Sequence, residues 1–140
     1  MGYPSSFAIS ALGMDVERLR VDVAALNLAN ANVALGASGE GFRPMQVVAR
    51  SNAAGFASQF DQWMKAPSVS VEPTAKAPRQ VLEPGHPMAD DKGFVNYPAV
   101  DHTAEMMTMM SAMRAYEANV AAMNMSRTMV LKALDIGGAQ

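Results

Sequence analysis

The sequence predicts a mainly α-helical protein with a small β-containing insertion. Its N- and C-terminal helices are expected to pair as an antiparallel, coiled-coil-like hairpin around a middle segment of short strands and loops. Two long helix-forming segments lie at the ends of the 140-residue chain, and the helix breakers lie between them. Every proline except Pro4 falls between Pro44 and Pro98, and Gly13 is the only glycine inside either helical segment.

This distribution predicts three parts. Residues 1–34 form the N-terminal helix of a core domain, residues 35–100 a small outer domain of strands and loops, and residues 101–140 the C-terminal helix of the core. A chain of this length suits one modest domain. Because the middle is rich in loops, the helical core is small, and a small core often needs a partner to bury its apolar faces.

The first helix is expected from about Ser5 to Val33, with Pro4 at its start. Its apolar residues alternate in steps of three and four, which is the seam of a heptad repeat with one asparagine in it. The seam residues are Ile9, Leu12, Val16, Leu19, Val23, Leu26, Asn30 and Val33.

Four short strands are expected in the middle segment: Met45–Ala49, a strand around Val69 and Val71, Gln80–Leu82 and Phe94–Tyr97. The surrounding prolines keep each strand short and suited to a sheet edge.

Phe56, Phe60, Trp63 and Met64 have helical spacing. This spacing is compatible with a short amphipathic helix and equally with a loop that packs its aromatic side chains onto the core.

The second helix is expected from about Asp101 to Leu134, with Asp101 as its N-cap and Glu105 in its first turn. A second stripe with steps of three and four consists of Met106, Met109, Met113, Tyr116, Val120, Met123, Arg127, Val130 and Leu134. Further methionines lie off this stripe, which indicates burial on several sides.

Both helices contain long stretches without charge, from Val23 to Gly39 and from Ala118 to Ser126. A helical hairpin alone in water normally carries charges on its outer faces. Alanine and asparagine fill these stretches; small residues let helices approach closely, and a buried asparagine favours one register. An ordinary two-helix hairpin and an assembly of several chains are both compatible with the pattern, and the uncharged faces favour assembly.

For assembly we expect subunit-interaction residues on both helices. They are Leu12, Val16, Leu19, Val23, Leu26, Asn27, Asn30, Asn32, Met106, Met113, Tyr116, Asn119, Val120, Met123 and Asn124.

The sequence gives little support for a catalytic or metal-binding site. There is no cysteine, and no basic stripe suggests nucleic acid as a partner. His86, Asp90 and Asp91 form the one cluster that resembles a metal or acid–base site, but they lie in a turn-rich stretch without a metal-binding pattern, so a solvated turn is favoured. No catalytic residue, metal or cofactor is predicted.

The N-terminus does not read as a cleaved signal peptide, and no apolar run is long enough to span a membrane.

Three stretches resemble flagellar basal-body rod, hook and hook-associated proteins. They are LRVDVAALNLANANV (Leu19–Val33), the helix from Glu105 to Gly137 centred on Arg114, Ala115, Tyr116, Ala118 and Asn119, and EPGHPMADDKGFVNYPAVD (Glu83–Asp101). The third stretch and the short chain are similar to the proximal-rod members of this family.

The resemblance implies a structural protein rather than an enzyme. Such proteins leave the cytoplasm through the flagellar type III export apparatus without signal-peptide cleavage. Their terminal helices stack with copies and with related rod proteins into an axial tube, which transmits torque across the periplasm, while the middle segment decorates the outside. The alternative from the residues is a soluble helical adaptor with a stable two-helix core.

Overall fold

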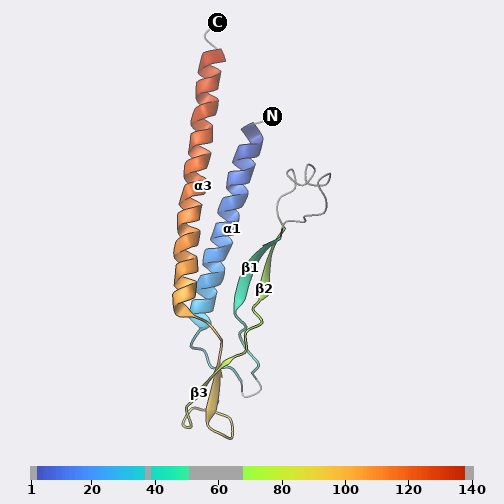
Figure 1. The fold of residues 1–140 in the computed structure, drawn as a ribbon, viewed down its shortest axis with the longest axis vertical. Helices are drawn as coiled ribbons and strands as arrows, with labels where there is room; N and C mark the ends of the chain where they lie inside the picture. The colour runs from blue at the N-terminus through green and yellow to red at the C-terminus, as the bar shows by residue number, and fades with distance from the viewer. Residues whose placement is uncertain (1–2, 37–38, 51–67, 138–140) are drawn as a thin grey trace. The chain divides into compact units, whose positions relative to one another are not determined.

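The computed structural model describes residues 3–36, 39–50 and 68–137. Within these ranges lie two long helices, one at each end of the chain, with short strands between them (Figure 1). The elements are α1 (Tyr3–Asn30), β1 (Met45–Arg50), β2 (Ser68–Pro73), β3 (Arg79–Leu82), β4 (Phe94–Tyr97) and α3 (His102–Gly137). The predicted fold class is therefore confirmed.

Helix α1 ends at Asn30, three residues earlier than the sequence predicted. The Asn30 side chain donates a hydrogen bond to the carbonyl of Leu26, 2.8 Å away. Ala31 and Val33 bond back only three residues, to the carbonyls of Leu28 and Asn30. These tighter bonds close the last turn and redirect the chain.

Helix α3 begins as the sequence predicted. Asp101 Oδ1 accepts hydrogen bonds from the backbone N–H groups of Thr103 at 2.9 Å and Ala104 at 3.2 Å. This carboxylate thus satisfies two of the amides that a helix leaves unpaired at its start. No proline or glycine follows until Gly137, and the helix runs to that residue.

The strands form two separate two-stranded sheets, β1 with β2 and β3 with β4. The β3–β4 pair is antiparallel, with Arg79 opposite Tyr97 and Leu82 opposite Phe94. All four strands lie where the sequence predicted short strands. The short helix proposed for Phe56, Phe60, Trp63 and Met64 lies outside the described residues.

One face of the β3–β4 hairpin is fixed by Val95, which is fully buried. On the same face, the Tyr97 hydroxyl donates a hydrogen bond to Glu83 Oε2 at 3.1 Å, and the Arg79 guanidinium lies 5.5 Å from the ring centre. Burial of the ring and the bond to Glu83 raise the pKa of Tyr97 above its ordinary value.

The turn between β3 and β4 is held by its own polar side chains. Asp90 Oδ1 accepts from the amides of Lys92 at 2.9 Å and Phe94 at 2.8 Å, and His86 Nδ1 accepts from Met88 N at 3.1 Å. Gly93 has a φ of 79°, a conformation that a residue with a side chain rarely adopts. His86 and Asp90 therefore serve the turn, and within the described ranges no group of three histidines or carboxylates could hold a metal.

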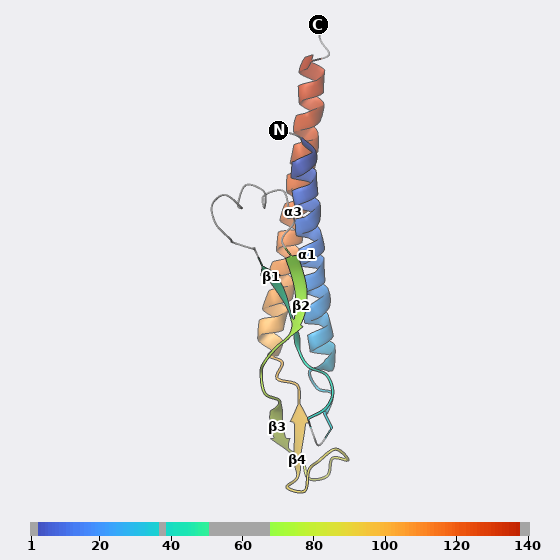
Figure 2. The same cartoon turned by 90° about the vertical axis from the view of Figure 1, so that its right-hand side faces the viewer.

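The chain divides into two compact units. Unit 1 combines residues 1–19, 49–69 and 110–140, and unit 2 combines residues 20–48 and 70–109. In each unit a length of α1 and a length of α3 lie side by side and run in opposite directions (Figures 1 and 2). Almost all buried side chains belong to unit 2, among them Ala24, Leu35 and Val95; unit 1 contributes only Ser10 and Ala112 from its described residues.

Candidate subunit-interaction surface

The helices of unit 1 approach closely at Gly13. A β-carbon placed on Gly13 would lie 2.7 Å from Nδ2 of Asn119. Such a distance is shorter than a real contact, so the amide of Asn119 occupies the space that the glycine leaves open. The two buried residues in the described part of this unit, Ser10 and Ala112, are also small. Small side chains therefore set the helix–helix distance here.

In unit 2 the helices are joined through Asn27, which is only 1% exposed. Its Nδ2 donates to the carbonyl of Met45 at 2.8 Å and to Glu105 Oε1 at 3.1 Å, and its Oδ1 accepts from Met45 N at 2.9 Å. One amide thus pairs both backbone groups of the first β1 residue and reaches the first turn of α3. Asn27 makes three hydrogen bonds at a place shielded from water. Replacing it would therefore leave several buried polar groups without a partner.

The helix seam differs from the predicted one by a single residue. Apart from Val23, the buried residues of α1 from Phe7 onward are Ser10, Ala24 and Asn27, and each directly follows a predicted seam residue. On α3 the buried residue is Ala112, directly before Met113, which is 52% exposed. Of the predicted stripe residues, Val23 is buried, whereas Leu26 and Met113 remain about half exposed. Small and polar residues line the contact because they let the two backbones come closer than leucine or methionine would.

The consequence is that both helices expose large apolar side chains. On α1 these are Ile9, Leu12 and Leu26. On α3 they are Met106, Met107, Met110, Met113, Tyr116, Val120, Met125, Met129, Leu131, Leu134 and Ile136. Exposed apolar side chains in such numbers are typical of surfaces that contact other proteins.

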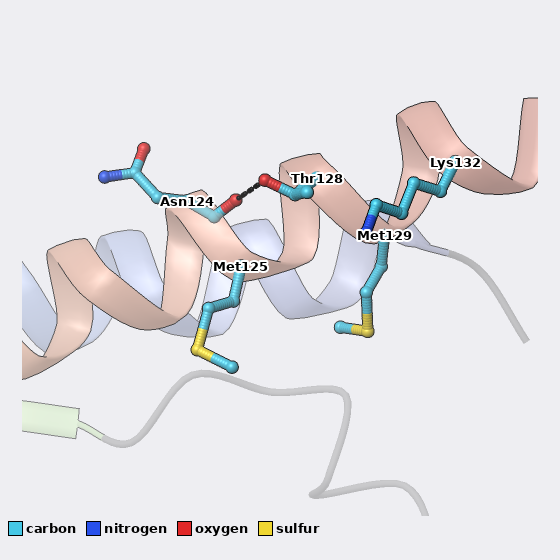
Figure 3. Close-up of a pocket in the computed structure, with 5 residues that line it drawn as sticks. All are labelled: Asn124, Met125, Thr128, Met129 and Lys132. Atoms are coloured by element: carbon cyan, nitrogen blue, oxygen red, sulfur yellow. Dashed lines mark hydrogen bonds between the residues drawn. The ribbon is translucent and has the colours of Figure 1, made fainter.

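Figure 3 shows one part of this surface in unit 1. A hollow of about 330 Å³ is lined by Asn124, Met125, Thr128, Met129 and Lys132. Met125 and Met129, one helical turn apart, project to the same side, while Thr128 Oγ1 bonds to the carbonyl of Asn124 at 3.0 Å. Flexible methionine side chains of this kind can adapt to the shape of a neighbour.

Comparison with known proteins gives a consistent result. The family described as "Flagellar basal body rod FlgEFG protein C-terminal" matches residues 91–136. The flagellar basal-body rod protein FlgC of Escherichia coli O6:H1 is 42% identical over 94% of this chain and 95% of its own length. The Salmonella typhimurium FlgC is 40% identical, and the Bacillus subtilis FlgC 33% identical, each over 94% of this chain and over 95% and 96% of their own lengths.

The chain belongs to the FlgC family of flagellar basal-body rod proteins. Membership confirms the resemblance found in the sequence and makes the protein a structural component of the flagellar rod rather than an enzyme. In the described part of this FlgC-family chain, no helix combines the length and apolar character needed to cross a bilayer.

The predicted interaction residues fall into three groups by exposure in this FlgC-family structure. Val23 and Asn27 are buried inside the chain, and Val16, Leu19, Asn30, Asn119 and Met123 are half-buried. The remainder are exposed: Leu12, Leu26, Asn32, Met106, Met113, Tyr116, Val120 and Asn124. The buried Asn27 holds its own chain together, whereas the exposed group is available to a neighbour.

Sequence reasoning missed two partnerships that hold the FlgC-family chain together. Glu105 was assigned only to the helix start, yet it accepts a bond from Asn27, 78 residues earlier. Gly13 was noted as the lone helical glycine, but nothing in the spacing paired it with Asn119. The one available signal was the presence of a glycine in the middle of a helix, which is unfavourable by about 1 kcal/mol and needs a packing reason.

Gly13→Leu is expected to destabilise the helix pair of unit 1 by about 1–3 kcal/mol, because an inserted side chain forces packed neighbours apart. Gly13→Ala is the matched control: the added methyl group displaces only the amide of Asn119, and alanine favours a helix over glycine by about 1 kcal/mol. Urea unfolding of both variants measures the difference. Equal midpoints for the two variants would show that the helices do not approach at Gly13.

Proposed function

We propose that this FlgC-family chain is a subunit of the proximal rod that assembles through α1 and α3 with copies of itself and with related rod proteins. The assembled helices form the axial tube, and the tube transmits torque across the periplasm. The chain reaches this place through the flagellar type III export apparatus, without a cleaved signal peptide.

The observation that carries the proposal is that the two helices bury one set of side chains within the chain and expose another. Small residues and Asn27 form the contact inside the chain, while methionine, leucine and tyrosine side chains remain exposed. Burying one methionine or leucine side chain contributes about 1.5–3 kcal/mol. Ten methionine and leucine side chains are exposed on the described parts of α1 and α3, so their burial by neighbours would favour association.

Charge supports the same proposal. The stretches from Val23 to Gly39 and from Ala118 to Ser126 contain no charged residue. A helix face that enters a contact between subunits needs this property, because an unpaired buried charge is strongly destabilising. A soluble adaptor with water on its outer faces has no need for uncharged stretches of this length.

Deletion of the gene and complementation with the wild-type chain test the proposal. The expected result is loss of swimming and of rods in purified basal bodies, with both restored by complementation. A deletion mutant that swims and has a normal rod would refute the proposed function.

A further inference from the structure

Unit 2 contains a cavity of about 390 Å³ that the helix contacts do not use. Apolar side chains, among them Phe42, Pro44 and Pro98, line part of it, and two exposed cations, Arg43 and Lys76, line another part. None of the described lining residues is acidic. A volume of this size lies within the range of about 300–1,000 Å³ typical of binding pockets. The cavity is thus suited to a group that is apolar at its tip and negatively charged beside it.

The turn between β3 and β4 has these properties. Met88 at its tip is 45% exposed, and Asp91, three residues later, is exposed as well. The turn contains three carboxylates and one lysine between Glu83 and Gly93, so it is acidic. Hydrogen bonds from Asp90 and His86 hold it in one conformation, and a preorganised loop loses little entropy when it binds.

The turn and the cavity lie at opposite ends of the same hairpin. Pro78 precedes β3 and Pro98 follows β4, so both lie at the end of the hairpin away from the turn, and both line the cavity. Four residues of strand separate the two sites by roughly 13 Å. Since the β-ladder is fixed by its hydrogen bonds, the turn cannot fold back into the cavity of its own chain.

We propose that the β3–β4 turn of one copy docks into the cavity of a second copy, with Met88 against Phe42, Pro44 and Pro98 and with Asp91 beside Arg43 and Lys76. Turn and cavity are different surfaces, so the contact is head-to-tail and leaves a free turn at one end and a free cavity at the other. Such contacts repeat along an assembly. The inference rests on the proposed self-assembly and adds a second contact, outside the helices.

Cysteine cross-linking in purified basal bodies tests the docking, because the natural chain contains no cysteine. Ala77→Cys combined with Met88→Cys places one thiol in the cavity wall and one at the turn. Mild oxidation is expected to give a ladder of disulfide-linked multimers. Gln80→Cys with Met88→Cys is the matched control, since Gln80 is exposed on the same hairpin but does not line the cavity; it should give no ladder. Rods that contain the first variant at wild-type level without a ladder would overturn the docking and leave the proposed function intact.

Exchange of charges tests the same contact without relying on oxidation. Lys76→Asp and Asp91→Lys are each expected to lower incorporation into the rod about tenfold, because like charges then face one another. The double variant should recover most of the wild-type level. A double variant that is incorporated no better than the poorer single variant would overturn the proposal. A loss with Lys76→Asp and none with Asp91→Lys would also overturn it, because the cavity would then bind a different anionic group.

Discussion

Asn27→Asp is expected to destabilise unit 2 by about 3 kcal/mol or more, the scale on which an unpaired buried charge acts. Aspartate can still accept from Met45 N but cannot donate to Met45 O, and it places a second carboxylate beside Glu105. Chemical unfolding of the purified chain measures the loss. Faster hydrogen exchange of the Met45 amide locates it, because Asn27 Oδ1 is the acceptor of that amide.

Two further variants test whether the effect of the new carboxylate depends on its burial and on the neighbouring Glu105. Asn32→Asp, an exposed asparagine in the same stretch, should change stability by less than about 0.5 kcal/mol. Asn27→Asp with Glu105→Gln should recover part of the lost stability, because glutamine removes the like charge and offers a donor. If Asn27→Asp is as stable as Asn32→Asp, Asn27 does not join the helices as described.

The second large effect is expected from charges on the exposed apolar surface. Leu26→Asp and Met113→Asp should each prevent incorporation into the rod and abolish swimming, because a subunit contact would bury the new charge without a partner. The isolated chain should change little, by at most about 1 kcal/mol, since Leu26 is 48% and Met113 52% exposed. Motility assays and unfolding curves of the same variants distinguish assembly from folding.

Leu26→Met and Met113→Leu are the matched controls for this experiment. They keep the apolar character and nearly the volume of each side chain, so both should swim. Normal swimming of either aspartate variant would show that its position does not enter a contact between subunits.

Most of the fold could be predicted because it depends on local signals. Prolines exclude helix from the middle, Asp101 is a typical N-cap, and alternation of valine with serine marks the strand around Val69 and Val71. The end of α1 was predicted three residues too late, because the side chain and turn bonds around Asn30 override a hydrophobic spacing that continues to Val33.

The register of the helix pair could not be predicted in the same way. Apolar spacing identifies side chains that favour burial, but it does not say which neighbour buries them. Leu26 and Met113 fit a heptad seam, yet Asn27 and Ala112 beside them are the residues that the chain buries. The partnership of Asn27 with Glu105 depends on the folded chain and leaves no trace in local spacing.

The one-residue offset between the two stripes places neighbouring residues of α1 in different surroundings. Consecutive residues of a helix are turned by about 100°, so Leu26 and Asn27 face different directions although they are adjacent in the sequence. Asn27 is 1% exposed and Leu26 48%. Substitutions at Asn27 are therefore expected to change folding, whereas substitutions at Leu26 change the surface that a neighbour would meet.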